Sequence, residues 1–121
     1  MTESTERPLG DLVREKGDEL GRFLRERVAA GEPEDSLMVL IVARRDSVTV
    51  GVVTRSEAAA QFASIASQLV ARGQTEAAAT TRAHARELTR PAATGQMWIA
   101  RITATGETLV AEVQSPLAPA A

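Results

Sequence analysis

Residues 37–53 read LMVLIVARRDSVTVGVV, and the rest of the chain is arranged around this stretch. Two runs of strand-forming residues flank a short polar segment, which is typical of a β-hairpin. We expect Arg45 and Asp46 to form its two-residue tip. That tip fixes the residue pairs on one face of the hairpin, and all of them are apolar: Ala43 with Val48, Ile41 with Val50 and Val39 with Val52.

The opposite face of the hairpin is also mostly apolar. It pairs Met38 with Val53, Leu40 with Gly51 and Val42 with Thr49. A strand with one side in water alternates apolar and polar residues, and residues 37–43 do not. We therefore expect this strand to be central and covered on both faces, either by a helix of the same chain or by a second copy of the protein.

Composition limits the architecture and the chemistry. With 121 residues the chain is long enough for one domain, and we expect a frayed segment at 1–7, a single domain at 8–115 and a disordered tail at 116–121. A net charge of −2 argues against a surface that is wholly a nucleic-acid footprint. There is no cysteine for disulfides, thiolate chemistry or zinc. The longest apolar run is too short for a membrane span and the N-terminus lacks a signal-peptide pattern, so we expect a cytoplasmic protein without a membrane partner.

Helical patterns flank the first hairpin. Apolar residues recur at three- and four-residue spacing over 8–30, which predicts an amphipathic helix that ends at Gly31. After the hairpin, Thr54 and Glu57 fit a capping box at the start of another helix. Residues 58–71 contain no charge, so we expect that helix to be buried nearly all round. Whether 57–90 forms one helix or two stays open.

A second hairpin closes the predicted domain. Strands 97–104 and 107–113 flank Thr105 and Gly106, and a two-residue tip that ends in Gly is a common hairpin signal. This register places Trp98 opposite Val113 and Ile99 opposite Glu112. The chain therefore predicts an α+β fold of the order α-ββ-α(α)-ββ, with a four-stranded, mainly antiparallel sheet packed by helices.

The function that we predict is a non-enzymatic protein-interaction module, such as an adaptor, chaperone or regulatory subunit. The reason is a surplus of apolar surface, because soluble monomers rarely expose large apolar patches. A homodimer through the sheet or the uncharged helix would cover that surface, and another protein is a further expected partner. The predicted partner-binding residues are Met38, Leu40, Val42, Val53, Phe62 and Leu69.

Two alternatives remain open. Arg82, Arg86 and Arg90 recur at four-residue spacing on the 75–90 segment, and a stripe of guanidinium groups suits phosphate, so a nucleic-acid-associated regulator is one alternative. Arg44 and Arg45 at the hairpin tip could add to such a stripe. The second alternative is a small-ligand-binding domain with a pocket between helix and sheet near Trp98.

The sequence contains no motif that indicates an enzyme. The glycine-rich nucleotide-binding loops, the G-x-S-x-G turn and the H-E-x-x-H metal motif are all absent. His84 is the single histidine, and with Glu87 it supplies two metal ligands at most. We therefore predict no catalytic residue, no metal site and no cofactor.

Overall fold

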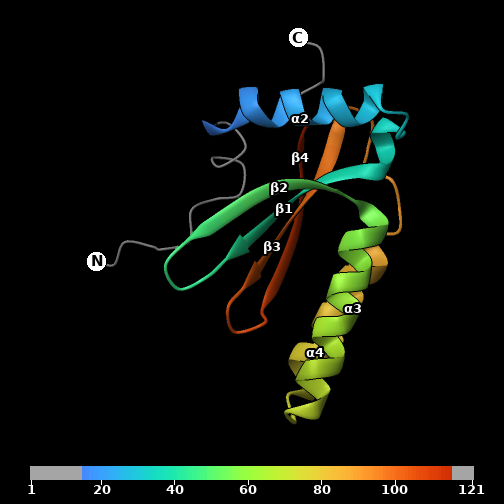
Figure 1. Cartoon of the computed structure of the whole chain (residues 1–121). Helices are drawn as coiled ribbons and strands as arrows, with labels where there is room; N and C mark the ends of the chain where they lie inside the picture. The colour runs from blue at the N-terminus through green and yellow to red at the C-terminus, as the bar shows by residue number, and fades with distance from the viewer. Residues whose placement is uncertain (1–14, 116–121) are drawn as a thin grey trace.

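The computed structural model describes residues 15–115, and the segments predicted as a frayed N-terminus (1–7) and a disordered tail (116–121) lie outside these residues. The fold is α+β, with a mixed, mostly antiparallel sheet of four strands (Figure 1). The strand order is β2-β1-β3-β4. The bounds are β1 Leu37–Ala43, β2 Val48–Thr54, β3 Gln96–Thr103 and β4 Thr108–Gln114.

The first hairpin has the predicted register. β1 and β2 pair antiparallel with Ala43 opposite Val48 and Val39 opposite Val52, and the Arg44 amide donates to the Ser47 carbonyl at 2.7 Å beside the tip. β1 also pairs in parallel with β3, so it is a central strand. Its first five residues are buried, which confirms that both of its faces are covered.

The second hairpin differs from the prediction by one residue. Trp98 lies opposite Glu112 and Ile99 opposite Ala111, because the loop contains three residues rather than two. Gly106 is the third loop residue, and its φ of 91° is in the left-handed region that favours glycine. Its amide donates to the Thr103 carbonyl at 3.0 Å, which closes the turn one position earlier than a Thr105–Gly106 tip would.

Helices cover the two faces of the sheet. The helix α2 (Gly17–Ala29) packs on one face, where Leu20 and Leu24 contact the buried side chains of β1 and β3. On the other face lie α3 (Arg55–Ala71) and α4 (Thr75–Glu87), which run side by side (Figure 1). A short 3₁₀ helix, η1 (Glu34–Ser36), leads into β1. The part of residues 8–30 that precedes Glu15 lies outside the described chain.

Residues 57–90 form two helices. The predicted capping box is present at the start of α3, where the Glu57 amide donates to Thr54 Oγ1 at 3.0 Å. Gly73 ends α3 with a φ of 77°, and the Gln74 amide donates to the Leu69 carbonyl at 2.8 Å, as in a Schellman motif. This turn allows α4 to fold back along α3 and cover the second half of the sheet.

Candidate interaction surface

The outer edge of β2 presents unpaired backbone groups. In an antiparallel pair, alternate residues direct both their N–H and C=O groups away from the partner strand. The bond from Arg44 to Ser47 fixes this alternation, so Val48, Val50, Val52 and Thr54 face outward. Thr54 agrees with that, because its amide donates to the Glu57 carboxylate at 2.9 Å instead of to β1.

Arg27 of α2 occupies one end of this edge. Its guanidinium donates from Nη1 to the Val52 carbonyl at 2.9 Å and from Nη2 to Glu32 Oε1 at 2.9 Å. The hydrogen bond with Glu32 raises the pKa of Arg27 and lowers the pKa of Glu32, so both groups stay charged. The pair therefore holds Arg27 against the backbone of β2.

The rest of the β2 edge has no side chain that occupies its backbone groups among residues 15–115. Val48 and Val50 have no hydrogen-bond partner for their outward groups among residues 15–115. The strand contains no charged residue and no proline, and the Val48 side chain is 58% exposed. Natural edge strands usually carry a charge, a proline or a cover that blocks pairing with another chain, as β4 carries Glu112. Among the residues that the structure describes, nothing pairs with this part of the β2 edge, so a further strand could add to it there.

The side of α3 that faces the first hairpin is also uncharged. From Ala58 to Ala71 the helix has no Asp, Glu, Lys or Arg. Gln61, Ser64 and Gln68 are exposed and share one side of the helix by their spacing. Gln68 lines a groove of about 370 Å³ together with residues of β1, which places this side of α3 next to the hairpin.

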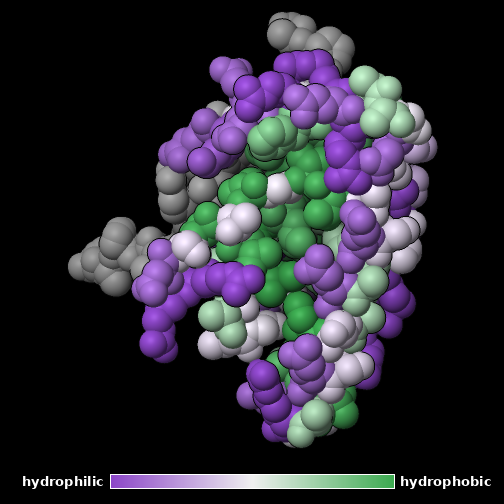
Figure 2. Space-filling model, in the orientation of Figure 1, coloured by the Kyte–Doolittle hydropathy of each residue, from purple (hydrophilic) through white to green (hydrophobic). Residues whose placement is uncertain are grey.

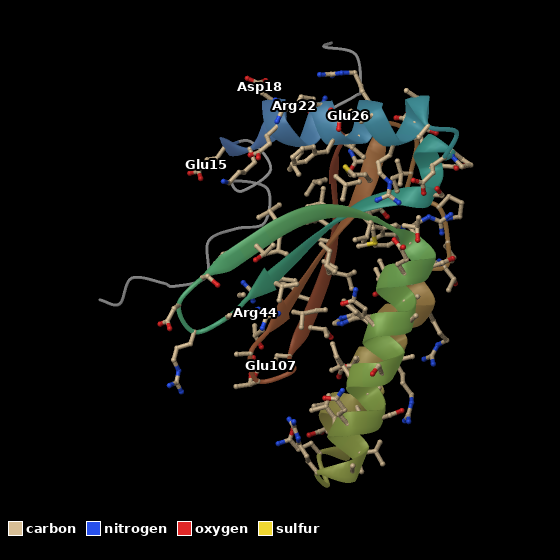
Figure 3. All side chains as sticks on the ribbon, in the orientation of Figure 1. Glu15, Asp18, Arg22, Glu26, Arg44 and Glu107 are labelled. Carbon is tan, nitrogen blue, oxygen red and sulfur yellow. The ribbon has the colours of Figure 1, made fainter. Side chains whose placement is uncertain are left out.

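These two features form one continuous region, which we call the β2–α3 surface. It consists of the outward backbone groups of Val48 and Val50 and the exposed side of α3 at Gln61, Ser64 and Gln68. Figure 2 shows hydrophobic side chains gathered over the sheet on this side, between α2 and α3. In Figure 3, Asp18, Arg22 and Glu26 lie along α2, and Arg44 and Glu107 lie near the hairpin tips. Arg44 also lines the groove that contains Gln68, so a charged side chain lies at the margin of the β2–α3 surface beside the hairpin tip.

Comparison with family models, curated proteins and solved structures finds no match to this chain. Within residues 15–115, no helix is long and apolar enough to span a membrane. In the same residues, no three His, Asp or Glu side chains lie close enough to hold a metal ion.

Most of the predicted partner-binding residues are core residues. Met38, Leu40, Phe62 and Leu69 are between 0% and 5% exposed, because α3 and α4 of the same chain cover the second face of β1. They are therefore not available to a partner, and that part of the prediction is wrong. Val42 and Val53 keep partial exposure at the margin of this core.

The expectation that α3 is buried nearly all round is also wrong. Only Ala58, Phe62, Ala66 and Leu69 are buried, and they form one side of the helix. The opposite side faces solvent, and Val70 is 42% exposed. The lack of charge in this helix thus marks an exposed surface rather than a buried one.

The predicted arginine stripe is only partly helical. Arg82 and Arg86 lie exposed on α4, which ends at Glu87, so Arg90 lies beyond the helix. The Arg90 carbonyl accepts a hydrogen bond from Trp98 Nε1 at 2.7 Å, which ties this turn to the sheet. Arg44 and Arg45 are exposed at the tip of the first hairpin, on a different element.

His84 joins α4 to β4. Its Nδ1 lies 2.9 Å from the Thr108 hydroxyl, which is also 3.2 Å from the Thr81 hydroxyl. The ring meets Phe62 edge-on with centroids 6.3 Å apart. Burial lowers the pKa of His84 from its usual 6.5, and the charge of Glu87 partly opposes this. The neutral imidazole is therefore the form that the fold favours.

We expect stability to fall on acidification through the titration of His84. Because the pKa is lower in the folded state, the unfolded chain binds the proton first. The contribution is therefore complete above about pH 6.5 and is lost as the pH falls below that value toward the folded pKa. Urea unfolding of the wild type and of His84→Gln, at about pH 7 and about pH 5.5, measures it. An equal loss in both proteins would contradict this role for His84.

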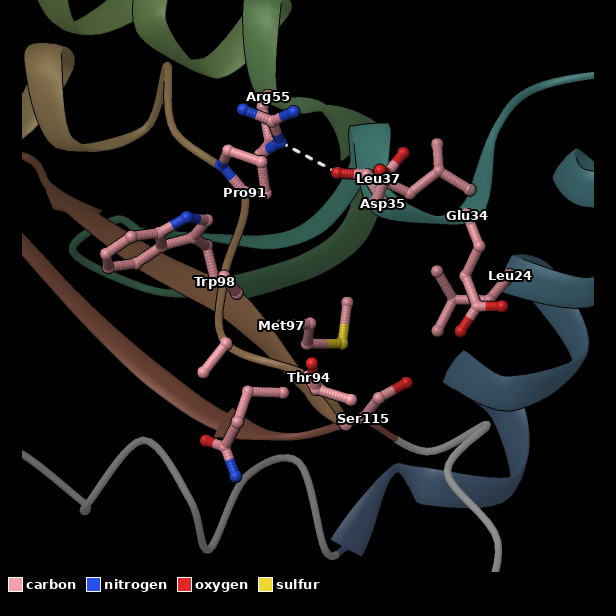
Figure 4. Close-up of a pocket in the computed structure, with 14 residues that line it drawn as sticks. Leu24, Glu34, Asp35, Leu37, Arg55, Pro91, Thr94, Met97, Trp98 and Ser115 are labelled. Carbon is pink, nitrogen blue, oxygen red and sulfur yellow. Dashed lines mark hydrogen bonds between the residues drawn. The ribbon is translucent and has the colours of Figure 1, made fainter.

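A cavity lies beside Trp98 (Figure 4). It has a volume of about 660 Å³ and lies where η1, the 91–96 loop and β3 meet. Leu24, Met97 and Trp98 are among its apolar lining residues. Its strongest donors are already engaged, since Arg55 Nε donates to the Asp35 carbonyl at 2.8 Å and Trp98 Nε1 to Arg90.

Sequence reasoning missed Arg27 and the outward groups of Val48 and Val50. The signal for the edge was present, because the predicted hairpin register already determines which residues of 48–54 face outward. The lack of charge in 48–54 was a second signal. No sequence pattern points from Arg27 to Val52, which are 25 residues apart in the chain.

Proposed function

We propose that the chain is a non-enzymatic, cytoplasmic protein-interaction module that associates with a second copy of itself through the β2–α3 surface. An adaptor or regulatory subunit of this kind would present its other faces to a further protein. The observation that carries the proposal is the open edge of β2 beside an uncharged side of α3.

The absence of charge favours a second copy as the partner. Residues close to a two-fold axis lie near the same residues of the other copy. A charged residue close to the axis would therefore face a like charge. The β2 strand and residues 58–71 contain none. Self-association through this surface therefore brings no like charges together near the axis.

The molar mass in solution tests the proposal. Light scattering on the full chain at micromolar concentrations should give twice the 12.8 kDa of the single chain. Because backbone hydrogen bonds of β2 and the uncharged side of α3 would form most of the contact, the dimer should largely persist at about 1 M salt, where ionic contacts are screened. A mass of one chain at every concentration would overturn the proposal. Salt-sensitive binding of duplex DNA or RNA through Arg82 and Arg86 would instead favour the nucleic-acid alternative.

Small-ligand binding is a second candidate because of the cavity beside Trp98. Its volume of about 660 Å³ is in the usual range for ligand pockets. Trp98 is the single tryptophan, so its fluorescence reports on this cavity alone. A saturable fluorescence change with fractionated small metabolites would support this candidate, and an unchanged signal with all fractions would count against it.

A further inference from the structure

Building on the self-association proposed above, we infer that two copies pair antiparallel along β2, with Thr49 of one copy opposite Thr49 of the other. The two four-stranded sheets then become one continuous sheet. In this dimer the two-fold axis passes beside Thr49, and that position determines which backbone groups of the two β2 strands pair.

The free backbone groups select this register. With Thr49 on the axis, Val48 faces Val50 of the second copy, and each such pair exchanges two hydrogen bonds. These are the residues whose outward N–H and C=O groups both lack partners among residues 15–115. A register centred on Val50 would instead pair Val48 with Val52, whose carbonyl already accepts from Arg27 at 2.9 Å. Arg27 thus limits the open edge to Val48 and Val50.

The charges at the two ends of β2 favour a second copy over an unrelated strand. Arg27 and Glu32 lie at one end of the edge, and Arg45 and Asp46 lie at the hairpin tip at the other end. In the proposed register Val52 lies opposite Asp46 of the second copy. Arg27, which is already paired with Glu32, would then have the Asp46 carboxylate of the second copy as a further partner, and the two-fold axis repeats this contact at the other end of the joined strands.

The same pairing would bring the two α3 helices to one face of the joined sheet. A two-fold axis perpendicular to the sheet keeps equivalent elements on the same side. In each copy α3 follows β2 directly and packs over β2 and β1. The uncharged sides at Gln61, Ser64 and Gln68 would therefore face each other across the axis, which explains why both features lie on one side of the molecule.

A single introduced cysteine tests the register. The natural chain has no cysteine, so Thr49→Cys carries one thiol. Opposite residues in a non-hydrogen-bonded antiparallel pair have Cα atoms about 4.5 Å apart, which a disulfide can span. Under mild oxidation we expect Thr49→Cys to form a covalent dimer about a hundredfold faster than Thr80→Cys on exposed α4, because pairing raises the effective thiol concentration.

The outcomes separate this inference from the proposed function. A dimeric wild type in which Thr49→Cys reacts no faster than Thr80→Cys would overturn the register and leave self-association intact. If Val50→Cys forms the covalent dimer faster than Thr49→Cys, the two-fold axis lies at Val50. This outcome would also overturn the register centred on Thr49. A monomeric wild type would overturn both.

A proline variant provides a second test that does not depend on thiol chemistry. Val50→Pro removes an outward N–H without removing a hydrogen bond between β1 and β2. We expect it to raise the dissociation constant at least about tenfold while Trp98 fluorescence stays that of the folded chain. A folded Val50→Pro variant with unchanged association would contradict edge pairing.

Discussion

Replacing Phe62 by alanine is expected to lower the free energy of unfolding by about 3–5 kcal/mol. The side chain is fully buried in the cluster that includes Met38, Leu40 and Trp98. Its removal leaves a cavity between α3 and the sheet, and it also removes the edge-on contact with His84. Urea unfolding followed by Trp98 fluorescence measures the change.

Val70→Ala is the matched control for this measurement. Val70 is on the same helix and is 42% exposed, so its truncation should cost less than about 1 kcal/mol. If Phe62 were a partner-binding residue on the surface, the two variants would have similar stability. Equal free energies of unfolding for Phe62→Ala and Val70→Ala would therefore contradict the placement of α3 against the sheet.

The double variant Gln61→Glu with Gln68→Glu should raise the dissociation constant of the dimer about a hundredfold, or about 2.7 kcal/mol. The substitutions keep size and helix propensity and add two negative charges to the uncharged side of α3. Across a two-fold axis they bring like charges together, which is costly at an interface. Sedimentation equilibrium measures the shift.

Gln74→Glu with Gln114→Glu controls for the change in net charge. Gln74 lies in the turn between α3 and α4, Gln114 ends β4 at the other edge of the sheet, and both are exposed and are not among the residues of the β2–α3 surface. This pair adds the same two charges and should leave the dissociation constant unchanged. An equal weakening in both double variants would show that overall charge, rather than this surface, controls association.

The first hairpin could be predicted residue by residue, whereas the second could not. Residues 44–47 allow a two-residue loop without a left-handed backbone, and the apolar pattern on both faces agrees with one register. Gly106 can serve either as the second residue of a two-residue loop or as the third of a three-residue loop. The pattern of 97–113 tolerates both registers, so only the structure shows that Ile99 lies opposite Ala111.

The position of the exposed surface could not be predicted from the sequence, although its composition could. The apolar face of β1 and the uncharged helix 58–71 were both expected to need a cover. The structure shows that buried α3 residues such as Phe62 cover β1 and that the helix exposes its other side. A helix of small, apolar and uncharged residues has much the same sequence pattern whether it is buried on one side or on both sides. Tertiary packing decides this, as it does the contact between Arg27 and Val52.

Amide hydrogen exchange as a function of protein concentration tests the central claim most directly, because it shows both whether the native chain associates and where. Above the dissociation constant, we predict slower exchange at the Val48 and Val50 amides, which lack partners within residues 15–115. On dilution these amides should exchange at the rate of an open edge strand, while those of α2 and α4 stay unchanged. Exchange at Val48 and Val50 that is equally fast at all concentrations, or protection confined to α2 or α4, would contradict association through the β2–α3 surface.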